Sequence, residues 1–354
     1  MPNALARLAR LARPVALLAL AALAAATPAR AAGETLRLAI WTNYMPDDVL
    51  ADFEKAAGCT VEVPWNYSSN DELLARLEGR ATGFDLAVPS DVILPALIAG
   101  GMLEPIDRAA LANAAHADPA FAKRQADPDG KWTVPYTWGT VGIAWRTDKV
   151  KTAPDSWHAF ADPALAGGNG FLLEEARDVV SAALLANGKD VNAVDGASLA
   201  AAKATLLTWR KAIKGFTGET KDHLLTGEAW LLMAYNGDVA QAMKEQPGKF
   251  GFTVPKEGGI LWIDNFVIPK GAPQKALAHK FIDFVLDPKV AARISASIRY
   301  ALANKDVAEH LPADLKADAV IYAPDAVKAR LHQYKDLGAD LTKVTDVLTE
   351  VRAK

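Results

Sequence analysis

The chain has 354 residues, of which 51% are apolar and 23% charged, and its formal net charge at pH 7 is −3. This composition is typical of a folded globular protein, and the length predicts about two domains. The acidic balance offers no basic surface for phosphate groups, so we expect no nucleic-acid partner.

Residues 1–31 have the pattern of a secretory signal peptide. Three arginines within the first 13 residues precede an apolar run, Val15–Ala26, and Ala29-Arg30-Ala31 supplies the small residues of a cleavage site. The run is shorter than the about 20 residues that span a bilayer, and no later segment comes close. No cysteine follows the cleavage site to carry a lipid, so we expect a free periplasmic protein. Because this segment holds four arginines and no acid, the rest of the chain carries −7.

From residue 36 onward, short apolar runs rich in β-branched residues alternate with segments whose apolar residues recur every 3.6 positions. This alternation predicts an α/β fold of βαβ units with a largely parallel sheet. In the first half the predicted strands are Leu36–Trp41, Val61–Trp65 and Phe84–Val88, and the predicted helices are Asp47–Ala57, Asp71–Glu78 and Asp91–Ala99.

A second alternating block follows residues 132–146, which predict two strands around Gly139. The later predicted strands are Gly170–Leu173, Ala229–Tyr235, Gly251–Val254 and Ile260–Ile268, and the predicted helices are Glu174–Ala186, Leu199–Ile213 and Val239–Glu245. The chain after residue 273 is predicted to be mainly helical. No Pro-rich linker separates the blocks, which indicates two α/β lobes that the chain crosses between more than once, as in hinge-closing receptors.

Motifs of catalysis and cofactor binding are missing from the sequence. It contains no Gly-x-Ser-x-Gly turn, phosphate loop or dinucleotide fingerprint. The six histidines lack the spacing of metal ligands, and the single cysteine, Cys59, cannot form an intrachain disulfide and is expected to be buried. We therefore expect a protein that is not an enzyme and that uses no cofactor and no metal.

The ends of several predicted strands combine aromatic residues with carboxylates or small hydroxyls. Ligands bind beyond the carboxyl ends of strands in open α/β sheets. Trp41 and Tyr44 follow the first strand, and Tyr235 and Asp238 follow a later one. Ser90 follows the third strand, where it could also cap the next helix.

Two further acid positions are informative. Glu175 and Asp178 lie three residues apart on one helical face near its N-terminus, where acids favour the helix dipole but also present two carboxylates at a spacing that suits ammonium groups. Trp262 and Asp264 lie two residues apart and therefore on one face of a strand. An aspartate within an apolar strand is costly unless something pairs with it, which favours contact with a ligand or partner.

Together these segments resemble the spermidine/putrescine-binding periplasmic proteins that feed ABC importers. The resemblance covers essentially the whole chain after the predicted signal peptide. It is carried by residues 41–46, 85–90, 134–139, 175–178 and 298–300 and, most specifically, by Pro255-Lys256-Glu257-Gly258-Gly259-Ile260-Leu261-Trp262-Ile263-Asp264.

The resemblance implies a two-lobed periplasmic binding protein fold of the type II-like class, with the ligand cleft between the lobes. Lobe 1 would comprise residues 32–138 and 262–308, and lobe 2 residues 139–261 and 309–354. The implied function is capture of a polyamine, putrescine or spermidine, and its delivery to an inner-membrane ABC permease. We expect the protein to be a monomer.

The same resemblance implies a set of ligand-binding residues. These are Trp41, Thr42, Tyr44, Ser90, Glu175, Asp178, Tyr235, Asp238, Trp262, Asp264 and Tyr300. The chain departs from the family at Val92, Tyr235 and Ala301, where the family has an aromatic residue, Trp and Pro, and Gln333 is a further candidate. These departures leave the preferred polyamine open.

Such a site would use two kinds of contact. Aromatic faces cover the methylenes and attract the cations, and fixed carboxylates measure the spacing of the ammonium groups. Three alternatives remain at this point: a binding protein for another organic cation or an amino acid, suggested by Asp91 and Val92; a polyamine sensor acting on a signalling receptor; and a secreted hydrolase with Glu175 and Asp178 as its acid/base pair.

Overall fold

The strands and helices alternate through most of the chain, as predicted. The computed structural model describes residues 34–67, 69–79, 83–121 and 127–354, and the predicted signal peptide lies outside these residues. The strands are β1 Thr35–Trp41, β2 Thr60–Tyr67, β3 Leu86–Ala87, β4 Leu103–Glu104, β5 Thr133–Arg146, β6 Gly170–Leu173, β7 Ile213–Thr217, β8 Leu231–Tyr235, β9 Phe250–Thr253, β10 Gly259–Pro269, β11 Ala301–Leu302 and β12 Leu331–Gln333. The helices are α1 Asp47–Ala57, α2 Asn70–Glu78, α3 Leu94–Ala99, α4 Pro163–Ala166, α5 Ala176–Ala186, α6 Gly196–Arg210, α7 Thr220–Thr226, α8 Asn236–Glu245, α9 Lys275–Leu286, α10 Pro288–Ile298, α11 Ala313–Lys316, α12 Asp325–Lys328 and α13 Leu341–Arg352.

Capping residues at the helix ends fix where helices α1 and α10 end and begin. Helix α1 ends at Gly58, whose φ of 66° is the left-handed conformation that glycine adopts without strain. Helix α10 begins with Pro288 at its first position, and the Asp287 side chain accepts hydrogen bonds from the amides of Lys289 and Val290. These local signals explain why α1 lies at its predicted position and why α10 begins at Pro288 within the segment predicted to be mainly helical.

The strands form a mixed sheet in the order β2-β1-β3-β10-β5-β8-β6-β7. Pairing is parallel at each end, between β1 and both of its neighbours and between β6 and both of its neighbours. The central strands β10 and β5 are antiparallel to each other. The prediction of a largely parallel sheet is therefore wrong at its centre. The reason is that the chain passes from the first half to the second along β5 and returns along β10, so the two crossing strands run in opposite directions.

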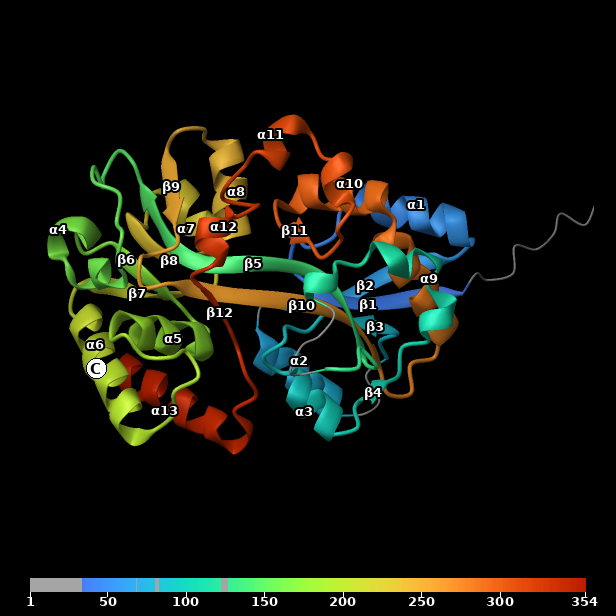
Figure 1. The fold of residues 1–354 in the computed structure, drawn as a ribbon, viewed down its shortest axis with the longest axis horizontal. Helices are drawn as coiled ribbons and strands as arrows, with labels where there is room; N and C mark the ends of the chain where they lie inside the picture. Colours follow the sequence, from blue (N-terminus) through green and yellow to red (C-terminus); the bar gives the residue numbers. More distant parts are fainter. Residues whose placement is uncertain (1–33, 68, 80–82, 122–126) are drawn as a thin grey trace, which may run out of the picture. The chain divides into compact units, whose positions relative to one another are not determined.

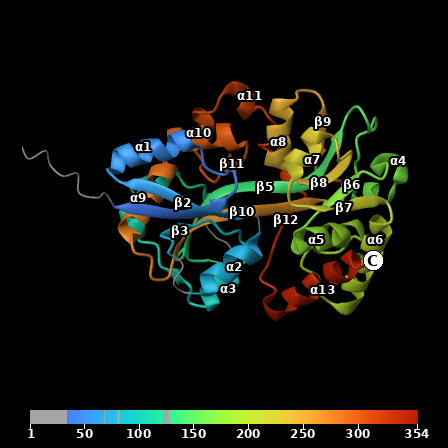
Figure 2. The ribbon, with the colours of Figure 1, turned by 180° about the vertical axis from the view of Figure 1, so that it is seen from behind.

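Helices cover both faces of this sheet. In the two opposite views, α1, α8 and α10 lie on one face and α2, α3, α5 and α13 on the other, with β5 and β10 running between the two halves (Figures 1 and 2). Two large apolar clusters fill the space under the helices. The first includes Phe53 and Phe281, and the second includes Trp157 and Trp209. The architecture is that of an α/β protein with two cores joined by crossing strands.

The region around Gly139 is one continuous strand, β5, and not the two strands predicted. A Cβ atom at Gly139 would lie 2.2 Å from Cζ2 of Trp262, the residue that pairs with it on β10. The glycine therefore allows an indole ring to pack across the strand and does not mark a break in it.

Several further boundaries differ from the predictions. Helix α3 begins at Leu94, so Ser90 does not cap it. Helix α6 ends at Arg210, and Ile213 opens strand β7. Helix α7 was not predicted. Cys59 is buried as expected. Among the described residues, no helix has both the length and the apolar character needed to cross a membrane.

The first apolar cluster provides a test of the packing. Phe281 is fully buried, and its ring centroid lies 4.9 Å from that of Phe53 and 6.0 Å from that of Phe266. We predict that Phe281→Ala lowers the free energy of unfolding by about 3–5 kcal/mol, because it removes a large side chain from a filled core. Phe284→Ala, on the partly exposed side of the same helix, should cost clearly less. Equal losses in chemical denaturation would contradict this assignment of the core.

Candidate ligand-binding site

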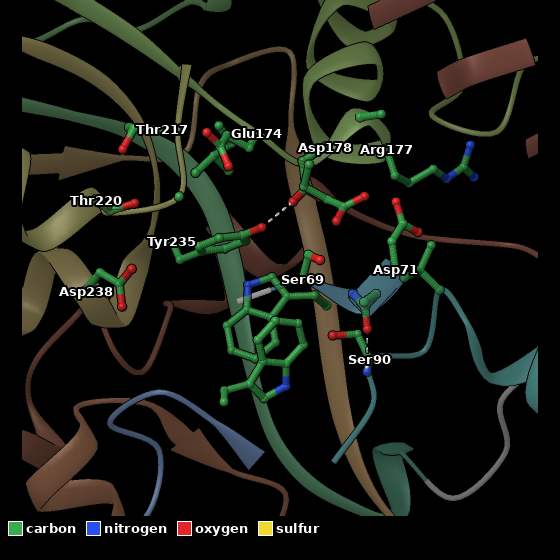
Figure 3. Close-up of a pocket in the computed structure, with 18 of the residues that line it drawn as sticks. Ser69, Asp71, Ser90, Glu174, Arg177, Asp178, Thr217, Thr220, Tyr235 and Asp238 are labelled. Atoms are coloured by element: carbon green, nitrogen blue, oxygen red, sulfur yellow. Dashed lines mark hydrogen bonds between the residues drawn. The ribbon is translucent and has the colours of Figure 1, made fainter. Parts of the chain in front are cut away.

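A cavity of about 880 Å³ lies where the carboxyl ends of β1, β3, β6 and β8 meet strand β10. All eleven residues predicted for the site line this cavity: Trp41, Thr42, Tyr44, Ser90, Glu175, Asp178, Tyr235, Asp238, Trp262, Asp264 and Tyr300. Val92 and Gln333 line it too. Figure 3 shows side chains from both halves of the chain directed toward the same space, with Asp178, Tyr235 and Asp238 from the second half and Asp71 and Ser90 from the first.

Asp264 is the central carboxylate of the first wall. It is 4% exposed, and its oxygens accept hydrogen bonds from the hydroxyls of Tyr44, at 2.8 Å, and of Ser90. The Tyr44 hydroxyl also shares a hydrogen bond of 2.7 Å with Thr137. Burial raises the pKa of Asp264 to about 7, although its two hydroxyl donors favour the ionised form. The partners of this aspartate are thus neutral groups, and its charge is not compensated by them.

Local irregularity in the strands places Asp264 and Ser90 together. The register between β10 and β5 shifts after Asp264, beside Pro135, which has no N–H to donate. Ser90 forms an isolated bridge with Asp264, and the amide of Asp91 donates to the carbonyl of Ile263 at 2.9 Å. Ser90 is therefore positioned by pairing with β10, which replaces the capping role that it could have had.

Aromatic rings form the middle of the cavity. The Trp262 ring centroid lies 5.2 Å from that of Tyr300 and 6.2 Å from that of Tyr235, and both pairs pack edge to face. The Trp41 indole donates to the carbonyl of Val88 at 2.8 Å, which fixes the orientation of its ring. Such rings can cover methylene groups with their faces and attract a cation.

The second wall carries a pair of acids at the start of α5. Asp178 is 4% exposed and accepts hydrogen bonds from the hydroxyls of Tyr235, at 2.7 Å, and Tyr334. Burial, together with the nearby charges of Asp178 and Asp71, raises the pKa of Glu175 to about 8. The two residues thus present adjacent carboxylates to the cavity.

Arg177, between these acids in the sequence, forms no hydrogen-bonded ion pair with either of them, although its charge lowers the pKa of Asp178. Its guanidinium lies 4.6 Å from the centre of the Tyr334 ring and donates to Asn192 Oδ1 at 2.7 Å. Figure 3 shows its side chain extending away from Asp178. Arg177 therefore supports the Tyr334 ring and leaves the carboxylates facing the cavity without a hydrogen-bonded cation.

The fourth acid, Asp238, lies at the start of α8. Its carboxylate accepts a hydrogen bond of 2.8 Å from the hydroxyl of Tyr300, whose oxygen accepts from the Asp238 amide at 3.2 Å. The Tyr300 ring lies over Gly237, where an added Cβ atom would come within 2.3 Å of it. Burial raises the pKa of Asp238 to about 6.

The sequence analysis missed Tyr334, Thr220 and Asp71, which also line the cavity. Tyr334 reaches the cavity because the short strand β12, which ends at Gln333, pairs with β10 and so places the next residue at the cavity wall. An aromatic residue after a strand was the signal used elsewhere in the chain, but a strand of three residues gives no periodicity by which to recognise it. Thr220 lies in the unpredicted helix α7.

The predicted acids of the site thus line the cavity without a hydrogen-bonded cation among the described residues. Arg177, Lys221 and Arg352 also line it, and they act on these acids only through their charge. No ion pair in the described part of the chain involves Glu175, Asp178, Asp238 or Asp264. Within the same residues, no group of His, Cys, Asp and Glu is arranged to hold a metal ion. The arrangement can neutralise positive charge at several points along an aromatic surface.

Comparison with known proteins agrees with this geometry. Over 332 residues the chain is 30% identical to spermidine/putrescine-binding periplasmic protein 1 of Haemophilus influenzae, covering 93% of this chain and 91% of that protein. Over 344 residues it is 33% identical to the putrescine-binding periplasmic protein PotF of Escherichia coli, covering 91% and 92%. The solved structure of the spermidine/putrescine ABC transporter substrate-binding protein PotD from Streptococcus pneumoniae has a TM-score of 0.79 at 26% identity, covering 91% of this chain and 99% of that chain.

These similarities confirm the resemblance inferred from the sequence and the two-lobed fold that it implied. The named relatives are binding proteins and not enzymes. Residues 48–323 match the sequence pattern of one family. The chain belongs to the family of bacterial extracellular solute-binding proteins.

Proposed function

We propose that this chain is a periplasmic solute-binding protein that captures putrescine or spermidine between two lobes and delivers it to an ABC import permease. One observation carries the proposal: four carboxylates from both halves of the chain meet at one aromatic cavity without an ion-pair partner in the described residues. The names of the relatives support the same ligand class. Binding, and not catalysis, is the activity that we assign.

A polyamine fits this arrangement chemically. Its ammonium groups would lie against the carboxylates, where charge-assisted hydrogen bonds are strong because little water competes. Its methylenes would pack on Trp41 and Trp262, which line the cavity and are partly exposed. The separation between Asp178 and Asp238, on opposite sides of Tyr235 in Figure 3, would favour a ligand with a cation at each end.

We also propose that the two lobes meet near Gly139 and Trp262 and close around the ligand. The apolar clusters support this boundary, because Trp138 belongs to the first and Val141 to the second, while the chain returns between Ile260 and Ile263. The sequence predicts that lobe 1 comprises residues 32–138 and 262–308 and that lobe 2 comprises residues 139–261 and 309–354. A ligand shifts such an equilibrium only if it contacts both lobes in the closed state.

The packing after residue 308 indicates that lobe 1 continues beyond that residue. Leu311, Leu315 and Ile321 pack in the first cluster, whereas Val344 and Val351 of α13 pack in the second. The final crossing would therefore lie between residues 321 and 344. We further propose that residues 1–31 direct export, that the mature protein is a monomer, and that it has no nucleic-acid partner.

Isothermal titration of the purified mature protein tests the function. Putrescine and spermidine should bind, and an uncharged sugar should not. Saturable binding of an amino acid or of an unrelated organic cation, with no heat from any polyamine, would overturn the proposal. Association of the polyamine-loaded protein with vesicles that contain the permease would test the delivery step.

A substitution at Asp264 should weaken binding most. Asp264→Asn keeps the size of the side chain but removes the buried charge opposite an ammonium group, so we predict an affinity loss on the order of 100-fold for putrescine. Asp325→Asn, at an exposed position on α12, is the control and should bind as the parent does. Parental affinity in the Asp264 variant, measured by titration calorimetry, would remove Asp264 from the site.

Binding should also depend on pH. The pKa values of Glu175, Asp264 and Asp238 are raised to about 8, 7 and 6 in the free protein, chiefly by burial. A bound ammonium group stabilises the ionised form of the carboxylates, and the amines themselves stay charged because their pKa is about 10. We therefore predict that affinity increases from pH 6 to pH 8 and that binding releases protons.

Titrations in buffers of different ionisation enthalpy would measure this proton release. An affinity that is constant over the same pH range would show that these three groups are already ionised before the ligand arrives.

A further inference from the structure

The hydroxyl of Thr220 is buried without a hydrogen-bond partner. Thr220 is the first residue of α7 and is 1% exposed, and its Oγ1 has no partner among the described residues. A buried hydroxyl that makes no hydrogen bond destabilises the folded state, since it loses the bonds to water that it had in the unfolded chain. Such an atom in a native protein calls for a specific explanation.

The neighbouring threonine behaves differently. Thr217 Oγ1 accepts a hydrogen bond from the amide of Glu219 at 2.9 Å and lies 3.3 Å from His223 Nδ1. The missing partner at Thr220 is thus a property of that position and not of the whole segment between β7 and α7.

Thr220 belongs to the wall of the ligand cavity. It lines the same space as Asp238, and the helices that carry these two residues, α7 and α8, pack against each other. Figure 3 shows Thr217, Thr220, Tyr235 and Asp238 on one side of the cavity. Threonine in a helix samples two side-chain rotamers, so the hydroxyl can turn toward a donor that enters beside Asp238.

The Asp238 carboxylate has acceptor capacity to share with this hydroxyl. Its Oδ1 takes the hydrogen bond from Tyr300, and no described residue donates to its Oδ2. A primary ammonium group carries three N–H donors, and a carboxylate oxygen and a neutral hydroxyl oxygen are both acceptors for it. An acetylated amine would bring a single N–H, no charge and a carbonyl oxygen that the carboxylate repels.

We propose that Thr220 is a specificity-determining residue whose hydroxyl accepts a hydrogen bond from the terminal primary ammonium of the ligand at Asp238. This end of the site would then require an unmodified amine. The inference rests on the proposed polyamine-binding function.

The variant Thr220→Val separates this role from a structural one, because we expect it to lower the affinity for the ligand without lowering the stability of the free protein. Valine has nearly the same shape but no hydroxyl, so the melting temperature of the free protein should stay the same or rise. The affinity for putrescine should fall about tenfold, the usual effect of losing one hydrogen bond to a charged group. The ratio of the affinity for putrescine to the affinity for N-acetylputrescine should decrease.

Thr217→Val is the matched control for stability. It removes a hydroxyl that has partners, so its melting temperature should fall. Thr220→Ser, which keeps the hydroxyl, should retain affinity, and Thr220→Ala should lose it, which repeats the comparison if the valine variant does not fold.

A Thr220→Val protein that binds putrescine with parental affinity and loses stability as Thr217→Val does would overturn the inference. Failure of the parent protein to bind any polyamine while folded would instead overturn the proposed function. The two failures are therefore distinguishable in the same set of titrations and melting curves.

Discussion

The burial of carboxylates that form no ion pair among the described residues is the constraint on which the rest of the site depends. Removing a carboxylate from water is costly, and the structure offsets that cost chiefly with hydroxyl donors. The charges of Arg177 and Lys221 contribute less, to Asp178 and Asp238 respectively. Asp264, Asp178 and Asp238 each accept a hydrogen bond from a tyrosine. A phenol fixes the direction of a carboxylate but does not neutralise it, so the negative charge remains available to a cation that enters the cavity.

The crossing strands connect this electrostatic arrangement to the architecture. Strand β10 carries Trp262 and Asp264 and also forms one of the two central connections between the halves of the sheet. Trp262 packs closely on Gly139 of β5, so the aromatic surface of the cavity lies where β5 and β10 pair. Any rearrangement at this crossing would change the geometry of the cavity, because the cavity wall and the connection between the two halves of the sheet use the same residues.

Local patterns predicted much of the fold, and the errors have physical causes. The alternation of apolar runs identified most strands and helices because burial of one face imposes a period of 2 or 3.6 along the chain. The same patterns say nothing about strand direction, and the antiparallel centre was therefore missed. Gly139 predicted a break because glycine weakens strands, whereas its actual role is set by an indole ring 123 positions later in the chain.

The amino-acid sequence by itself determined the chemistry of this protein: an α/β fold, aromatic residues and acids at the ends of strands, and the resemblance that relates them to one family. Only the tertiary structure decided which groups meet. Tyr334 donates to Asp178 from 156 residues away, and Ser90 pairs with Asp264 in place of capping a helix. The Thr220 hydroxyl has no hydrogen-bond partner in the part of the chain that the structure describes. These contacts follow from the packing of distant segments, which no local periodicity encodes.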